Sequence, residues 1–243
     1  MKRSSLVSLS LFALALGVVA TVALAADAAK PAKPAKPAAA AKPAAVAAST
    51  DKAIAAIDAQ IAAAKVNKGA PSWKMHLPQP KLVTFDPAKK YYARMTTNVG
   101  TMTIELKTKA APMHATNFIY LARLGFYDGL KFHRVIKGFM AQGGDPAGNG
   151  TGGPGYQIAL EVSPGVKHDQ IGVLSTANAG PDTDGSQFFL MFKPASYLDG
   201  KYSIFGQVTE GLDVVKKLED AGNPNDGPPL SPLSITSVTI EAK

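Results

Sequence analysis

Residues 132–145 read FHRVIKGFMAQGGD, and this stretch decides how the rest of the chain is interpreted. One arginine, Arg134, lies among apolar residues, and two glycines close the run. An arginine is costly to surround with apolar groups unless another group meets its charge. With the two-residue period of a strand, Phe132, Arg134 and Ile136 share one face. The stretch therefore predicts strands that carry isolated polar side chains on an apolar background.

The sequence from residue 89 onward has the pattern of a β-rich domain. The expected strands are residues 91–96, 101–106, 131–136, 139–143, 156–160, 171–175, 187–192, 203–208 and 234–241. One helix is expected to begin at Pro112 and to stop at Gly125, and a second covers residues 212–220. Many short strands with two helices predict a mainly β fold, a barrel or a sandwich with two capping helices.

The N-terminus, residues 1–25, has the pattern of a signal peptide. Lys2 and Arg3 precede an apolar run over residues 6–25, which ends in the small-residue sequence Ala-Leu-Ala. The run is about 20 residues long, enough to span a bilayer, so an uncleaved membrane anchor is the alternative. Both interpretations predict that the rest of the chain is extracytoplasmic, and we expect the periplasm.

Residues 26–50 form an expected disordered linker rich in alanine, lysine and proline, which cannot bury a core. Residues 1–88 carry a net charge of +7, whereas residues 89–243 carry +1. We interpret the linker as a solvated spacer, with weak contact to anionic envelope polymers or lipids as the alternative. Similar basic tails bind DNA, but the export signal argues against nucleic acid as a partner.

Residues 51–88 are expected to hold a short helix and an irregular, proline-rich lead-in. Thr50 or Asp51 can cap the helix. Its apolar face carries Ile54, Ile57 and Ile61. Three isoleucines are too few for an independent domain, so the helix is expected to dock on its neighbour or on a partner. The sequence does not choose between these, and the domain proper is expected to span residues 89–243.

Several common catalytic patterns fail on inspection. Residues 148–153, GNGTGG, fit the dinucleotide motif GxGxxG, but Pro154 follows where a helix should begin, so we predict a surface loop. The chain has no cysteine, and its four histidines are scattered without paired spacing. No GxSxG sequence surrounds a serine. We therefore expect neither a metal nor a cofactor.

Taken together, five stretches resemble the cyclophilin family of peptidyl-prolyl isomerases. They are FHRVIKGFMAQGGD (132–145), GNGTGG (148–153), LSTANAG (174–180), GSQFFL (185–190) and YLDGKYSIFGQV (197–208). Their order and spacing are close to those of the family. The resemblance covers about residues 89–243 and implies a closed, eight-stranded antiparallel barrel capped by two helices, with the site on its outer surface.

The resemblance also implies roles for individual residues. Arg134 corresponds to the family's catalytic arginine. The proline pocket corresponds to Phe139, Met140, Phe189 and Leu198. The contacts to the substrate backbone correspond to Gln142, Ala177, Asn178 and Gln187.

Two positions depart from the family pattern within the expected substrate site. Tyr197 replaces a tryptophan beside the groove, and Tyr202 replaces a histidine. The family's tryptophan contributes to cyclosporin binding, so we expect any cyclosporin binding to be weak. An aromatic surface and a polar tip are retained, so catalysis is expected to survive both changes.

The implied function is isomerisation of X–Pro bonds in unfolded or flexible exported proteins. We expect the enzyme to be a monomer, although the sequence does not give the oligomeric state. Two alternatives from other classes stay open at this point. A chaperone or scaffold would bind proline segments without turnover, but it would not need a cationic donor at the amide. A carrier of a small apolar ligand would need a hollow barrel interior.

Overall fold

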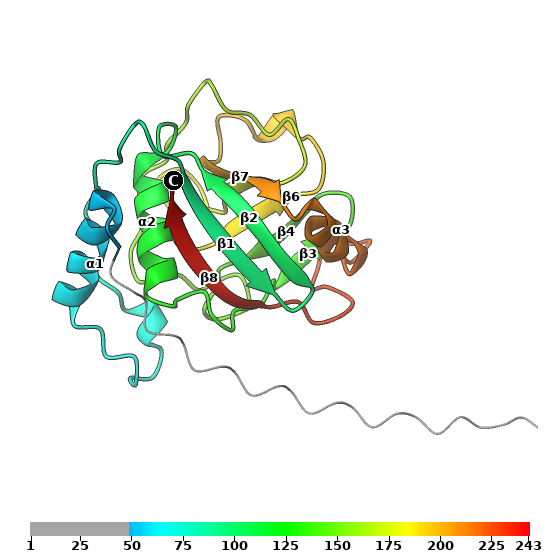
Figure 1. The fold of residues 1–243 in the computed structure, drawn as a ribbon. Helices are drawn as coiled ribbons and strands as arrows, with labels where there is room; N and C mark the ends of the chain where they lie inside the picture. The colour runs from blue at the N-terminus through cyan, green and yellow to red at the C-terminus, as the bar shows by residue number, and fades with distance from the viewer. Residues whose placement is uncertain (1–48) are drawn as a thin grey trace, which may run out of the picture. The chain divides into compact units, whose positions relative to one another are not determined.

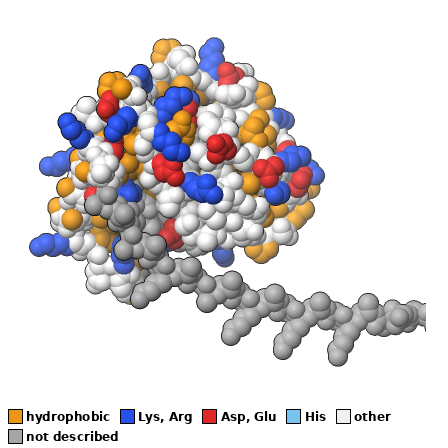
Figure 2. Space-filling model, in the orientation of Figure 1, with side chains coloured by type: hydrophobic (Ala, Val, Ile, Leu, Met, Phe, Trp, Pro, Cys, Tyr) orange, Lys and Arg blue, Asp and Glu red, His pale blue; other side chains and the backbone are white. Residues whose placement is uncertain are grey.

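The computed structural model describes residues 49–243 (Figure 1). The expected signal peptide, residues 1–25, and all but the last two residues of the expected linker lie outside the described residues. In the described part of the chain, no helix combines the length and apolar character needed to cross a membrane. Lysine, arginine and acidic side chains are interspersed on the face seen in Figure 2.

The fold is an eight-stranded antiparallel sheet that curls around a packed core (Figure 1). Its strands follow the order β3-β4-β6-β5-β7-β2-β1-β8. They are β1 Tyr91–Thr97, β2 Gly100–Leu106, β3 Arg134–Ile136, β4 Met140–Gly143, β5 Val173–Thr176, β6 Phe188–Met191, β7 Ile204–Glu210 and β8 Ile235–Ala242. The mainly β prediction is confirmed, and alternation along β1 buries every second residue.

The expected closed barrel is matched in part. The two edge strands, β3 and β8, are not paired with each other along their lengths. Instead the segments just before them meet at one isolated bridge between Lys131 and Ser234. The Phe132 amide also donates to the Leu233 carbonyl at 3.0 Å. The sheet is therefore strongly curled, with its edges joined by a short contact rather than by a full ladder.

Two expected strand assignments are wrong in detail. Residues 156–160 form no strand, and Ile158 makes only an isolated bridge to Asp184. The Tyr156 hydroxyl instead donates to Asn117 at 2.6 Å, which holds this segment against a helix. The expected strand 131–136 begins three residues later, at β3.

The prediction that Phe132 and Arg134 share one face is also wrong, because the strand begins only at Arg134. Phe132 is 1% exposed and packs edge-on against Phe188, with ring centroids 6.2 Å apart. Arg134 is half-buried on the outer surface. The two side chains do not share a face because the backbone between them is irregular and only becomes a strand at Arg134.

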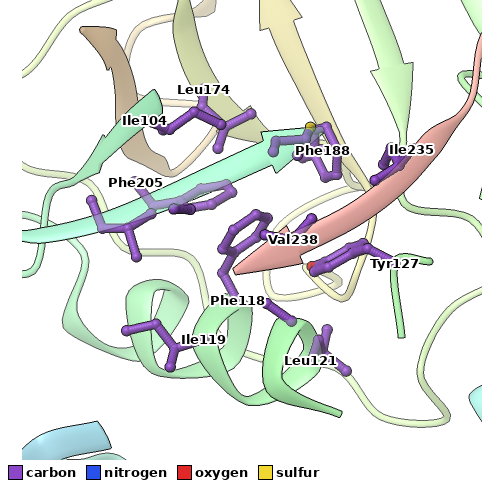
Figure 3. Packing of buried hydrophobic residues seen from close by; sticks show 14 of the residues in the cluster. Ile104, Phe118, Ile119, Leu121, Tyr127, Leu174, Phe188, Phe205, Ile235 and Val238 are labelled. Carbon is purple, nitrogen blue, oxygen red and sulfur yellow. The ribbon is translucent and has the colours of Figure 1, made fainter. Parts of the chain in front are cut away.

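Two helices cover the sheet as expected, α2 Pro112–Arg123 and α3 Leu212–Asp220. The helix α2 directs Phe118 into the core, where it meets Tyr127, Phe188 and Phe205 (Figure 3). These rings fill the space inside the curled sheet. The interior is thus occupied by the chain's own side chains, which argues against the ligand-carrier alternative.

The first helix, α1 Lys52–Ala64, docks on the chain's own domain and lies beside α2 (Figure 1). Of the two expected caps, Asp51 is the one used, because its carboxylate accepts from the Ala53 and Ile54 amides at 3.0 and 3.1 Å. The guanidinium of Arg123 pairs with Asp58 across the two helices. The choice that the sequence left open is therefore settled for the described structure.

Candidate active site

A surface groove of 310 Å³ lies on the outer face of β3, β4 and β6. Antiparallel pairing places Gln142 of β4 opposite Arg134 of β3 and, on its other side, Phe189 of β6. The lining consists of Arg134, Phe139, Met140, Gln142, Ala177, Asn178, Phe189, Leu198 and Tyr202. A cation, two amides and an apolar floor thus meet in one depression.

The apolar floor of the groove belongs to a small cluster separate from the main core. Met140, Phe189 and Leu198 are 2%, 6% and 8% exposed, so each is fixed by packing. Leu198 comes from the 3₁₀ turn η2, Ser196–Leu198. The ring of Tyr202 meets Phe189 edge-on, with centroids 5.4 Å apart. The floor is therefore closely packed and apolar, which suits it to a compact aliphatic ring.

Arg134 lies at the rim of the groove and is held by two partners. Its Nε and one terminal nitrogen each donate to the Asp226 carboxylate at 2.6 Å. The other terminal nitrogen donates to Oε1 of Gln142 at 3.2 Å. Hydrogen bonding to the Asp226 carboxylate raises the pKa of Arg134 above its ordinary value. A guanidinium has five N–H donors, so one remains on each terminal nitrogen after these three bonds.

A chain of side-chain amides continues from Arg134 across the surface. Gln142 donates through Nε2 to Oε1 of Gln187 at 2.9 Å. Gln187 then donates to the carbonyl oxygens of Gly150 and Gly152 at 2.9 and 2.8 Å. The expected surface loop at residues 148–153 is confirmed, and these bonds tie it to the groove.

A second hollow, of 750 Å³, adjoins the groove and shares Gln142, Ala177 and Asn178 with it. Asn178 is fixed there, because its Nδ2 donates to Oδ1 of the fully buried Asp184 at 2.8 Å. Gln187 lines this second hollow. The groove and the hollow therefore meet along these amides.

Behind Asn178 lies a buried charge cluster. His114 contacts Asp184 through Nε2 at 2.8 Å and Glu161 through Nδ1 at 2.5 Å. Burial would lower the pKa of His114, but the hydrogen bonds to both carboxylates outweigh it and raise the pKa above its ordinary value. Burial would likewise raise the pKa values of Glu161 and Asp184, and hydrogen bonds from His114 lower them.

The structure brings together nine of the eleven side chains that the sequence predicted for the site. Gln187 lines the adjoining hollow instead. Tyr197 lines neither space: it is 63% exposed, and its ring stacks on Phe139 with centroids 6.3 Å apart. Among the residues described, 49–243, no group of three or more His, Asp or Glu side chains is arranged to hold a metal ion.

Sequence reasoning missed Asp226, the partner of Arg134. It lies in the run Asn223-Pro-Asn-Asp-Gly227, which reads simply as a turn. A half-buried arginine implies that a carboxylate lies nearby. Nothing in the sequence says which of the acidic residues supplies that carboxylate. The charge of Arg134 is met at the surface, 92 positions further along the chain.

The fold is a curled eight-stranded sheet, and the groove that combines a cation, two amides and an apolar floor lies on its outer face. The model of the family "Cyclophilin type peptidyl-prolyl cis-trans isomerase/CLD" matches residues 92–240. A peptidyl-prolyl cis-trans isomerase of Helicobacter pylori is 51% identical over 134 residues, which are 54% of this chain and 82% of that protein. A peptidyl-prolyl cis-trans isomerase-like 1 protein of Rhizopus delemar is 50% identical over 125 residues, 50% and 76% of the two chains.

Solved structures are similar as well. A cyclophilin type peptidyl-prolyl cis-trans isomerase of Cryptosporidium parvum has a TM-score of 0.60 and 34% identity, covering 63% of this chain and 98% of that one. A crystal structure of that isomerase in the presence of the dipeptide Ala-Pro has a TM-score of 0.59 and 36% identity, covering 62% and 98%. The chain belongs to the cyclophilin-type peptidyl-prolyl cis-trans isomerase family. It is an isomerase of X–Pro peptide bonds.

Proposed function

We propose that Arg134 accelerates rotation about X–Pro bonds by donating a hydrogen bond to the prolyl nitrogen as the amide twists. In the planar amide the nitrogen lone pair is shared with the carbonyl, which gives a barrier near 20 kcal/mol. Twisting localises the pair on nitrogen, where it can accept a hydrogen bond. A donor that binds the twisted form better than the planar form lowers the barrier. No covalent intermediate is formed.

The observation that carries this proposal is the joint position of a charged donor and an apolar notch. Arg134 lines the same 310 Å³ groove as the buried side chains Met140, Phe189 and Leu198. In our proposal these side chains and Phe139 hold the proline ring while the preceding carbonyl rotates. Gln142, Asn178, Gln187 and Ala177 hold the substrate backbone on either side.

The required reduction of the rotation barrier is larger than one hydrogen-bond donor supplies. An uncatalysed X–Pro bond relaxes over tens of seconds or longer. Reaching milliseconds requires a barrier about 6–7 kcal/mol lower. One placed charged donor in a partly dry site contributes about 3–4 kcal/mol. The remainder is assigned to the grip on the ring and to the removal of water that favours the planar amide.

The test of Arg134 uses isomerisation of a proline tetrapeptide in a protease-coupled assay. Arg134→Ala is expected to lower kcat/KM by about a hundredfold or more. Arg134→Lys is expected to recover only part, because a point charge lacks the planar fork of donors. Circular dichroism confirms that the fold is kept. Undiminished turnover by Arg134→Ala would remove this residue from its proposed role.

We further propose that the clients are unfolded or flexible exported polypeptides and that the enzyme works outside the cytoplasm, most consistently in the periplasm. The support is the signal-like pattern of residues 1–25 and the spacer-like composition that follows. Residues 1–48 fused to a reporter that needs disulfides to fold should give an active reporter in a bacterial host. An inactive reporter retained in the cytoplasm would contradict export.

The groove also bears on cyclosporin. Tyr197 is 63% exposed and lies outside the groove lining. We propose that it offers such a ligand less apolar surface than the tryptophan implied by the family. Tyr197→Trp should then tighten cyclosporin binding, measured by inhibition of the same assay. Equal inhibition of both proteins would show that this position does not control the affinity.

A further inference from the structure

The hollow beside the groove has one wall that comes from outside the family domain. The matched family region begins at residue 92, whereas Met75 lies in the lead-in that precedes it. Met75 ends the 3₁₀ turn η1, Trp73–Met75, and lines the 750 Å³ hollow. Met75 is 36% exposed as a residue, so part of it is available to a bound molecule.

The segment that carries Met75 is fixed on both sides of it. The Leu77 amide donates to the Pro154 carbonyl at 2.9 Å, and Leu77 is 5% exposed. Lys74 donates through Nζ to the Asp128 carbonyl at 2.8 Å. Contacts made by both neighbouring residues therefore fix the position of Met75 at the wall of the hollow.

Gly155 shows how closely the two segments approach each other. Its φ of +98° lies in the region that favours glycine. A Cβ on Gly155 would lie 2.6 Å from the Met75 carbonyl oxygen. The absence of a side chain at Gly155 thus allows the lead-in to lie directly on the wall of the hollow.

The hollow is continuous with the catalytic groove and carries no charge of its own. It shares Gln142, Ala177 and Asn178 with the groove. No Asp, Glu, Lys, Arg or His is among the described residues that line it. A charged substrate side chain entering it would lose hydration without meeting an opposite charge. Met75 instead presents a flexible, polarisable thioether that packs against varied apolar shapes.

We propose that Met75 is a specificity-determining residue. Met75 contacts the substrate side chain that points from the groove into the hollow. That side chain belongs to a residue near the isomerised bond, and it lies outside the proline pocket. Met75 favours an apolar side chain there over glycine or a charged one. This inference rests on the proposed binding of X–Pro segments in the groove, and it assigns a catalytic-domain function to the N-terminal lead-in.

The test compares two tetrapeptide series built around one Ala-Pro bond. One series places Gly, Leu or Glu two positions before the proline, and the other places them directly after it. NMR exchange at catalytic enzyme concentration gives kcat/KM for each peptide. The series whose variable side chain reaches the hollow is the one in which the wild-type protein has a higher kcat/KM for Leu than for Gly. In that series Met75→Ala should reduce the Leu-to-Gly ratio of kcat/KM about threefold to tenfold.

Three further variants sharpen the comparison. Met75→Leu conserves volume and should keep the ratio within about twofold. Met75→Lys should raise the Glu-to-Leu ratio in the same series, because it adds an opposite charge to a neutral hollow. Leu82→Ala is the matched control: Leu82 is a 58% exposed apolar residue of the same lead-in that does not line the hollow. It should leave every ratio unchanged.

Different results would contradict the role of Met75 and the proposed function. Equal Leu-to-Gly ratios for Met75→Ala and the wild-type protein in both series, with turnover intact, would overturn the role of Met75 alone. Lack of turnover by the wild-type protein on every peptide would overturn the proposed function, and this inference with it.

Discussion

Arg134 combines two requirements that conflict at the scale of a single residue. It must stay charged beside an apolar floor, and it must keep donors free for a substrate. Asp226 meets the first requirement with two hydrogen bonds of 2.6 Å, while the three bonds to protein leave one N–H on each terminal nitrogen. The pair is partly solvated, with side-chain exposures of 37% and 64%, so it orients the guanidinium more than it stabilises the fold.

Asp226→Asn is expected to lower kcat/KM about twofold to fivefold, because the guanidinium loses its two-point anchor and samples more orientations. The free energy of unfolding should change by less than about 1 kcal/mol, since exposed ion pairs contribute little. Peptide isomerisation and urea unfolding measure the two effects. Asp220→Asn is the matched control, because Asp220 is an exposed carboxylate paired with Lys216 and does not contact Arg134. A kcat/KM unchanged in Asp226→Asn would show that Gln142 and packing suffice.

Whole elements could be predicted where a local rule fixes them. The cap of α1 at Thr50 or Asp51, the start of α2 at Pro112 and the loop at residues 148–153 each follow from the chemistry of one or two residues, and the structure selects Asp51 as the cap. The expected strand at residues 156–160, which the structure does not form, has a composition typical of strands. A strand also needs the free edge of a neighbouring strand to pair with, and the sequence does not show where such an edge lies. Likewise the ion pair of Arg134 with Asp226 and the position of Met75 depend on segments distant in sequence.

The element scale gives a direct test of how α1 is attached. Asp51→Ala removes the cap and the 2.8 Å ion pair with Lys89. The free energy of unfolding should fall by about 0.5–2 kcal/mol, the usual range for a lost N-cap. Amides in the first turn of α1 should also exchange faster with deuterium. Thr50→Ala, one residue earlier and exposed, is the control and should stay within about 0.5 kcal/mol of the wild-type protein.

At the scale of the whole described domain, His114 joins α2 to two loops distant in sequence, through the half-buried Glu161 and the buried Asp184. Burial would lower the pKa of His114, but the hydrogen bonds to the two carboxylates raise it above its ordinary value. Its contribution is therefore complete below about pH 6.5 and is lost as the pH rises through the folded-state pKa. The lowered pKa values of Glu161 and Asp184 have the opposite consequence, since their contribution is lost only as the pH falls below the ordinary range of carboxylates.

We therefore expect the free energy of unfolding to decline as the pH rises from about 6.5 toward 9, measured by urea unfolding at each pH. His114→Gln should flatten this decline, while His76→Gln, at an exposed position, should leave it in place. The half-buried His133 does not affect the comparison, because its partial burial lowers its pKa and places its effect below pH 6.5. A wild-type stability that is constant or increasing over this range would contradict the assigned charge of the cluster.

Substrate binding and bond rotation can be measured on the same sample, which isolates the contribution of Arg134. NMR exchange spectroscopy of an Ala-Pro peptide gives the cis–trans rate and the dissociation constant together, for the wild-type protein and for Arg134→Ala. We predict that the substitution slows enzyme-bound rotation about a hundredfold or more while binding weakens by less than about tenfold. Equal rotation rates in the two proteins would contradict the claim that the guanidinium stabilises the twisted amide.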